Sequence, residues 1–151
     1  MLKFRGLLKK GERGQGFMEL AVSLVFLLML LSVVVDLGWA FYELIALRDA
    51  AQEAASFGAM CPTDTALVEE RLRLSASTPL DIDDIDPANI DIEIIDPATG
   101  APAAATRGMA MRVSVTIDHD IMTPFLGAII GTQTYPLSVN VSDTIMRDNC
   151  N

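Results

Sequence analysis

Lysine is absent after Lys10, and positive charge is scarce in the rest of the chain. Residues 1–14 carry a net charge of +4, whereas the whole chain carries −9, which leaves −13 on residues 15–151. An acidic body of this kind argues against binding to nucleic-acid phosphates, because that binding requires clustered positive charge. It suits a solvated domain outside the cell.

Cysteine and histidine are also rare. The chain has two cysteines, Cys61 and Cys150, and a single histidine, His119. The absence of a CxxC pair argues against a redox or metal centre, so we expect no cofactor. An oxidising compartment would permit a disulfide between the two cysteines. It would close a loop of about 90 residues, worth on the order of 4–5 kcal/mol in the chain-entropy model. Two free thiols are the alternative.

The sequence also lacks a catalytic constellation. Asp118-His119-Asp120 has the composition of a proton-transfer group, but no serine or cysteine nucleophile can be placed beside it. The triplet lies at the end of a predicted strand, so we expect a surface histidine there. No other set of residues suggests catalysis, and we expect a protein that is not an enzyme.

One long hydrophobic run stands out, from Phe17 to Val35, and Glu19 is its only charged residue. As a helix these 19 residues are about 28 Å long, enough to cross the core of a bilayer. The run is long for a cleaved signal peptide, and Asp36-Leu37-Gly38-Trp39-Ala40 is a poor cleavage site. We therefore expect a single-pass membrane segment.

Charge predicts the orientation of this segment. Basic residues precede it and acidic residues follow it, which places the N-terminus in the cytoplasm. Trp39, Phe41 and Tyr42 are typical of an outer aromatic belt. We therefore expect the chain to have four parts: a cytoplasmic basic leader (1–14), a transmembrane helix (15–36), an amphipathic outer continuation of the same helix (37–60) and an extracytoplasmic domain (61–151).

Helical periodicity continues beyond the membrane segment, because no proline occurs before Pro62. We predict one helix over residues 17–59. Its outer half has an apolar stripe at helical spacing, consisting of Ala40, Leu44, Leu47, Ala51 and Ala54. Glu43, Asp49 and Glu53 are predicted to lie off that stripe.

The C-terminal domain is predicted to combine one short helix with three strands. The helix covers residues 65–74, with Thr63 or Asp64 as its cap, and places Leu67, Glu70 and Leu74 on one face. Alternating apolar residues predict strands at 89–95, 109–117 and 135–141, and a short apolar turn or helix at 123–131. The fold class is α+β, with a small antiparallel sheet covered by the long helix.

The segment between the short helix and the first strand is acidic. Asp81, Asp83, Asp84 and Asp86 would suit a calcium ion by chemistry, but they lack the spacing and glycine of an EF-hand loop. We expect a solvated linker.

Glu19 is the least expected residue of the membrane segment. A carboxylate at membrane depth costs a few kcal/mol, and more when it has no partner. If Glu19 lies close to the headgroups, it needs no partner. A plain anchor has no use for such a residue, which favours a segment that also takes part in assembly.

The sequence around Glu19 resembles the TadE-like pseudopilins of the tight-adherence (Tad/Flp) pilus, a branch of the type IV pilin superfamily. The resemblance lies in Gly14-Gln15-Gly16-Phe17-Met18-Glu19-Leu20-Ala21, in Val35-Asp36-Leu37-Gly38-Trp39-Ala40-Phe41-Tyr42, and in the alanine-rich residues 46–51. It is strongest over residues 13–59. Strand and turn patterns near the C-terminus are also similar, whereas the acidic residues 75–106 match no family pattern.

The resemblance implies that a prepilin peptidase cuts between Gly14 and Gln15. It also implies that Glu19 pairs with the N-terminal amine of a neighbouring subunit. The implied partners are the peptidase, other pilin subunits, an inner-membrane assembly platform and membrane lipid. The implied function is that of a minor pilin or pseudopilin in pilus assembly, adhesion or secretion.

Two alternatives remain open. In the first, the chain is an extracytoplasmic binding module on a single-pass membrane anchor, and it is never cleaved, so it keeps residues 1–14. In the second, the chain is a major pilus subunit, although major subunits of this type are little more than the helix. The additional domain of roughly 90 residues favours the minor role.

Overall fold

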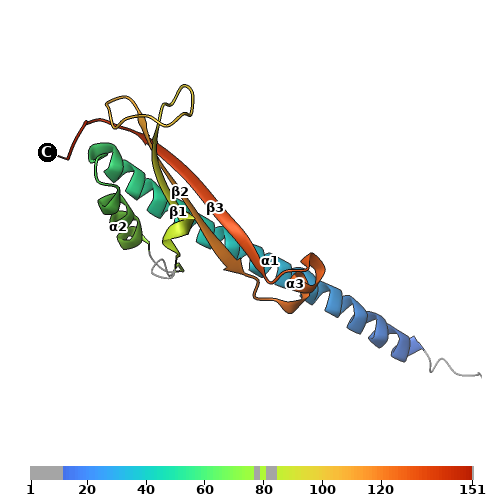
Figure 1. Ribbon diagram of the computed structural model, residues 1–151. Coiled ribbons are helices and arrows are strands. Elements are labelled where there is room, and N and C mark those ends of the chain that lie inside the picture. Colours follow the sequence, from blue (N-terminus) through green and yellow to red (C-terminus); the bar gives the residue numbers. More distant parts are fainter. Residues whose placement is uncertain (1–11, 77–78, 81–84, 151) are drawn as a thin grey trace, which may run out of the picture.

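One long helix runs through the whole length of the described molecule, and the other elements lie along it (Figure 1). The structure is a computed structural model, and it describes residues 12–76, 79–80 and 85–150. Helix α1 (Glu12–Met60) contains 49 residues and is about 74 Å long. The predicted helix over 17–59 is confirmed and begins five residues earlier than expected. Residues 1–11, most of the predicted leader, lie outside the described residues.

A three-stranded antiparallel sheet lies along the C-terminal half of α1. Its strands are β1 (Ile90–Ile95), β2 (Ala110–Asp120) and β3 (Thr134–Thr144), in the order β1-β2-β3. The register pairs Ile92 with Val113 and Val113 with Val141. All three predicted strands are confirmed, and β2 and β3 extend beyond their predicted ends. The fold is α+β, as predicted, and is consistent with a pilin-like architecture.

The core lies between α1 and one face of this sheet. Alternate residues of β2, namely Met111, Val113 and Val115, are fully buried. They face a stripe of small residues on α1, which lets the helix approach the sheet closely. This stripe comprises Ala50, Ala51, Ala54, Ala55 and Ala59, together with Leu47. Gly58 continues it, because an added Cβ there would lie 2.8 Å from the Cγ atom of Met111.

Helix α2 (Thr65–Ser75) packs against the end of α1. Its N-cap is Asp64, whose carboxylate accepts a hydrogen bond from the Leu67 backbone N–H, one of the two predicted caps. The buried residues of α2 are Val68 and Leu72. Leu67 and Leu74, which the sequence places on one face, are exposed. The face of α2 that packs into the core is therefore the one with Val68 and Leu72, and not the one predicted from the sequence.

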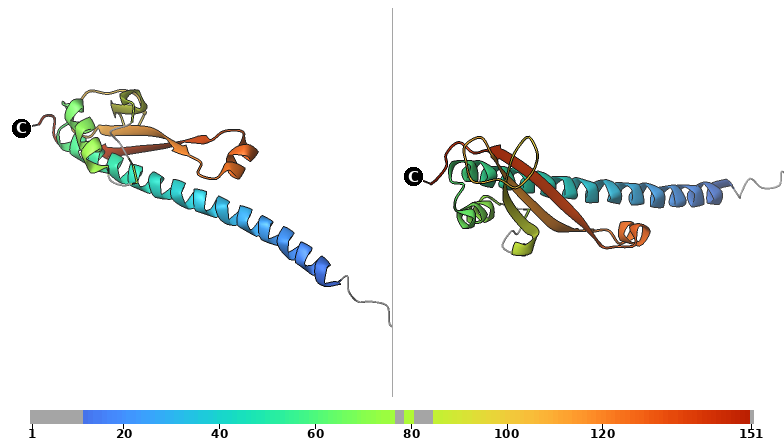
Figure 2. Two further views of the ribbon diagram at one scale, coloured as in Figure 1. Left: turned by 90° about the horizontal axis from the view of Figure 1, so that it is seen from below. Right: turned by 45° about the horizontal axis from the view of Figure 1, so that its top comes forward.

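A short helix, α3 (Pro124–Ile130), connects β2 to β3. It ends at Gly131, which has the left-handed φ of 84° that favours glycine. The predicted turn or helix at 123–131 is therefore a helix. Figure 2 shows that α3 lies at the end of the domain nearer the N-terminal half of α1.

The acidic segment is only partly described. Asp81, Asp83 and Asp84 lie outside the described residues. Asp86 caps the 3₁₀ helix η2 (Pro87–Asn89), and its carboxylate accepts a hydrogen bond from the Ala88 N–H. Ile85, directly before it, is buried in the core, so the end of this segment is part of the folded domain.

Candidate functional site

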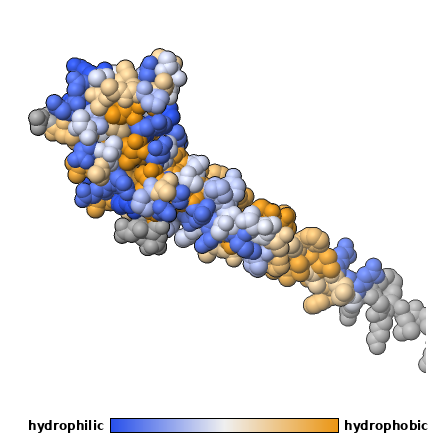
Figure 3. Space-filling view, in the orientation of Figure 1, coloured by the Kyte–Doolittle hydropathy of each residue, from blue (hydrophilic) through white to orange (hydrophobic). Residues whose placement is uncertain are grey.

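The N-terminal half of α1 protrudes beyond the domain with its apolar side chains uncovered (Figures 1 and 2). Large hydrophobic residues are exposed on all sides of it, among them Phe17, Leu24, Phe26 and Leu30. Figure 3 shows this half as a continuous hydrophobic surface, in contrast to the mostly hydrophilic domain. Within the described residues, α1 is the helix long and apolar enough to cross a membrane.

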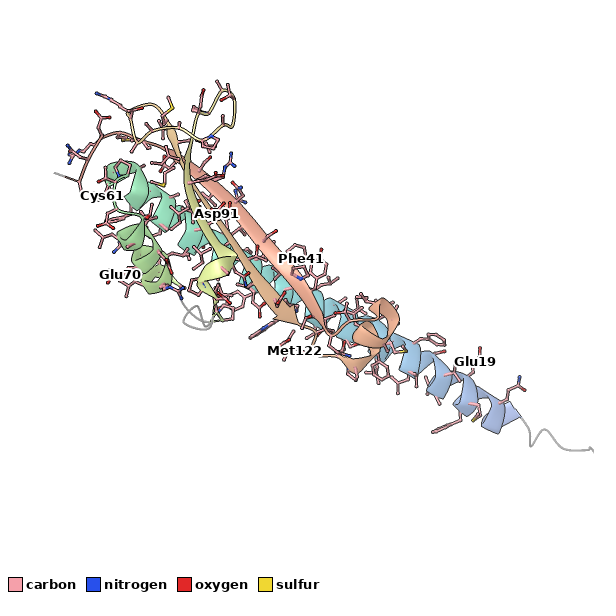
Figure 4. All side chains as sticks on the ribbon, viewed as in Figure 1. Glu19, Phe41, Cys61, Glu70, Asp91 and Met122 are labelled. Atoms are coloured by element: carbon pink, nitrogen blue, oxygen red, sulfur yellow. A yellow bond between two sulfur atoms is a disulfide. The ribbon has the colours of Figure 1, made fainter. Side chains whose placement is uncertain are left out.

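Glu19 lies on this protruding half, far from the folded domain (Figure 4). Its side chain is exposed and has no hydrogen bond or ion pair to another described residue. Sixteen uncharged helical residues separate it from the next carboxylate, Asp36. Within the described chain, the domain therefore supplies no partner for Glu19.

The expected cleavage position lies within the first turns of α1. Gly14 and Gln15 are helical and exposed. A Cβ added to Gly14 or to Gly16 would meet no atom within 4 Å, so packing does not explain either glycine. Each glycine weakens the helix by about 1 kcal/mol relative to alanine. This turn is therefore the least stable part of the described helix by composition.

The domain first covers α1 at Asp36, which is only 2% exposed. Its Oδ2 atom accepts a hydrogen bond from the Thr123 hydroxyl, directly before α3. Its Oδ1 atom is buried and has no partner among the described residues. A carboxylate that the sequence placed at the end of the membrane segment is thus held against the domain.

His119 contradicts its predicted place on the surface. The side chain is 4% exposed, and its Nδ1 atom lies 2.7 Å from the Oε2 atom of Glu43 on α1. Glu43, predicted to lie off the apolar stripe, faces the sheet and is 15% exposed. The alternation of β2 explains this result, because His119 has the same parity as the buried Val113 and Val115. Extending the alternation of the predicted strand by one step, from Ile117 to His119, identifies His119 as a buried position.

A cavity of about 190 Å³ lies beside these polar groups. Its lining combines Asp36 and His119 with apolar side chains from α1, α3 and the ends of β2 and β3. The Nε2 atom of His119 is buried and, like Asp36 Oδ1, lacks a partner among the described residues. The described residues include no group of three or more metal-ligating side chains.

Further contacts hold the other end of α1 to the end of the chain. Ser56 donates a hydrogen bond to Asp143 at 2.8 Å, and the Met146 N–H donates to the Ala59 carbonyl at 2.9 Å. Cys61 and Cys150 form a disulfide with their Cα atoms 4.4 Å apart. The folded domain is therefore attached to α1 from Asp36 to the end of the helix at Met60, and the helix before residue 36 carries the exposed apolar surface.

The N-terminal part of the chain matches a known family. The model of the TadE-like protein family aligns with residues 14–56. This part of the chain is similar to the TadE-like proteins. The match begins at Gly14 and includes Glu19 and Asp36, so it spans the protruding half of α1 and most of the helix that carries the domain.

This TadE-like match associates the chain with the Tad pilus and with other pilus components. A helix that can cross a membrane fits a membrane-associated pilus protein. Searches among curated proteins and among solved structures give no match.

Proposed function

We propose that this TadE-like chain is a minor pilin or pseudopilin of a Tad-type pilus. The observation that carries the proposal is the division of α1 into a bare apolar half with a lone carboxylate and a half covered by the domain. The bare half spans the cytoplasmic membrane before assembly and packs against neighbouring subunits afterwards. The chain serves as a peptidase substrate and as a structural part, and it performs no catalysis itself.

Charge sets the orientation in this proposal. The net charge of +4 on residues 1–14 remains in the cytoplasm, and the acidic domain lies outside the membrane. The outside is also the compartment in which the Cys61–Cys150 disulfide persists. Charge and the disulfide are independent arguments, and both place the domain outside the membrane.

Processing occurs between Gly14 and Gln15. Hydrolysis of that peptide bond leaves a carboxylate on Gly14 and a new α-amine on Gln15. The helical conformation of this turn favours the rival, an uncleaved anchor, because a protease requires an extended strand. The two unpacked glycines oppose that reading, since they lower the cost of unwinding the turn in the peptidase cleft.

Glu19 acquires its partner during assembly. A carboxylate in an apolar environment requires a cation or hydrogen-bond donors, and the domain offers none among the described residues. The N-terminal amine of a neighbouring subunit supplies the charge. The pair then sets the axial register between subunits. The domain of roughly 90 residues supports a minor role, since major subunits of the family are little more than the helix.

The decisive experiment is N-terminal sequencing of the mature protein from cells with and without the prepilin peptidase. We expect the protein to begin at Gln15 only when the peptidase is present. An intact leader in cells with active peptidase would establish the uncleaved anchor instead. The copy number of the protein in purified pili separates a minor subunit from a major one.

A further inference from the structure

The short helix α3 presents an apolar face that the domain does not cover. Its exposed side chains are Phe125, Ile129 and Ile130, and Met122 lies exposed just before it. The segment from residue 121 to residue 142 contains no charged residue, although the chain as a whole is strongly acidic. An exposed apolar cluster of this kind marks an interaction site.

This face lies beside the outer end of the apolar half of α1. Thr123 is hydrogen-bonded to Asp36, and Leu126 and Ile130 line the same cavity as Leu37 and Ala40. Figures 1 and 2 place α3 at the end of the domain that points toward the bare half of α1. The exposed surface of α3 and the exposed surface of α1 are therefore neighbours.

The dimensions of a bilayer give the depth of α3. Residues 17–35 extend for about 28 Å, close to the roughly 30 Å of a hydrocarbon core. The headgroup layers extend the total to about 40–45 Å, which adds about 5–7.5 Å, or roughly three to five helical residues, on each side. Those residues, 36–40, are the ones next to α3. The helix α3 thus lies at the level of the outer headgroups.

We infer that α3 inserts its apolar face into the outer interface of the membrane that α1 spans. The inference rests on the membrane span in the proposed function and adds a second lipid contact to it. Lipid is the occupant favoured by the continuity of the two apolar surfaces and by the exposed aromatic residues Trp39 and Tyr135 near the same level. The contact holds the domain at a defined angle to the membrane.

The test uses the full-length chain in vesicles of phosphatidylcholine and phosphatidylglycerol with bromine on the acyl chains. An environment-sensitive fluorophore is attached to one introduced cysteine in each variant, since the native cysteines are paired. Leu28→Cys reports the span, Ile129→Cys reports α3, and Thr99→Cys in the distant turn reports the solvated end. We expect quenching by brominated lipid at the first two positions and none at the third.

Each other outcome overturns the inference in a recognisable way. Quenching at Leu28 without quenching at Ile129 would leave the span intact and remove the α3 contact. A blue-shifted but unquenched probe at Ile129 would show that protein, such as a second copy, covers α3. A solvated probe at both positions would remove the span and the inference together.

A matched pair of charge substitutions provides a second readout. Ile129 and Leu74 have nearly equal exposure, 73% and 72%, but Leu74 lies on α2. With the fluorophore at Met122→Cys, Ile129→Asp should abolish quenching, whereas Leu74→Asp should leave it unchanged. Neither side chain is part of the core, so both variants should fold. Unchanged quenching in Ile129→Asp would refute the lipid contact.

Discussion

The Nδ1 atom of His119, near the end of β2, lies 2.7 Å from the Oε2 atom of Glu43 on α1, across 76 residues of sequence. The hydrogen bond of Asp36 to Thr123 lies two turns nearer the N-terminus of the same helix. These two polar contacts hold the tip of the sheet to α1 at the point where its covered half begins. They fix the position of the domain relative to the segment proposed to span the membrane.

His119→Ala should destabilise the protein by about 1–3 kcal/mol, because Glu43 loses its partner while remaining largely buried. Urea unfolding of the full chain in detergent measures the effect. Asp120→Ala, at the exposed neighbouring residue, should change stability by no more than about 0.5 kcal/mol. A double-mutant cycle with Glu43→Ala should give a coupling of about 0.5–3 kcal/mol. Equal effects of His119→Ala and Asp120→Ala would show that the contact between His119 and Glu43 contributes nothing to stability.

Cys61→Ser combined with Cys150→Ser should lower the free energy of unfolding by on the order of 4–5 kcal/mol, since the bond closes a loop of 89 residues. Alkylation of the exported protein should detect no free thiol until a reductant is added. Quantitative labelling without reductant would show that the bond is absent from the mature protein.

Glu19→Ala should leave cleavage intact but impair assembly, because the substitution removes the carboxylate and not the cut site. The measurements are the mature N-terminus and the amount of assembled pili. Glu19→Asp retains the charge and should assemble better than Glu19→Ala. Normal piliation in Glu19→Ala would refute the pairing role.

Gly14→Phe should block processing, because a bulky side chain obstructs the cleft that accepts the chain at the cut site. The mass of the mature protein measures this. Gly38→Phe is the matched control, since Gly38 is also a helical glycine with no atom near its Cβ position. Processing should be normal in the control. Normal processing in Gly14→Phe would move the cut to another bond.

Gly58→Leu should destabilise the domain by about 1–3 kcal/mol, since even a Cβ there would lie 2.8 Å from Met111 Cγ and 3.2 Å from Val68 Cγ2 in the core. Gly38→Leu should be neutral or stabilising by up to about 1 kcal/mol, because leucine favours a helix more than glycine does. Thermal unfolding in detergent compares the two. A tolerated leucine at residue 58 would mean that the core rearranges around it.

Local patterns predicted the elements of this fold well. The strand alternation around Val113 and Val139 and the uninterrupted helix up to Met60 depend on near neighbours in sequence, so periodicity identifies them. The same patterns could not select among apolar faces. On α2 the sequence offers Leu67 and Leu74 as readily as Val68 and Leu72, and only the contact with α1 buries the second pair.

The sequence by itself determined the order of the parts: a basic N-terminal segment, an apolar helix with Glu19, and an acidic α+β domain, because charge and hydropathy along the chain are sufficient to define them. Tertiary structure alone decided the partners of Asp36, Glu43 and His119 and the position of α3. Those contacts join residues more than 70 positions apart, and the packing of the sheet on the helix sets which side chains are buried together.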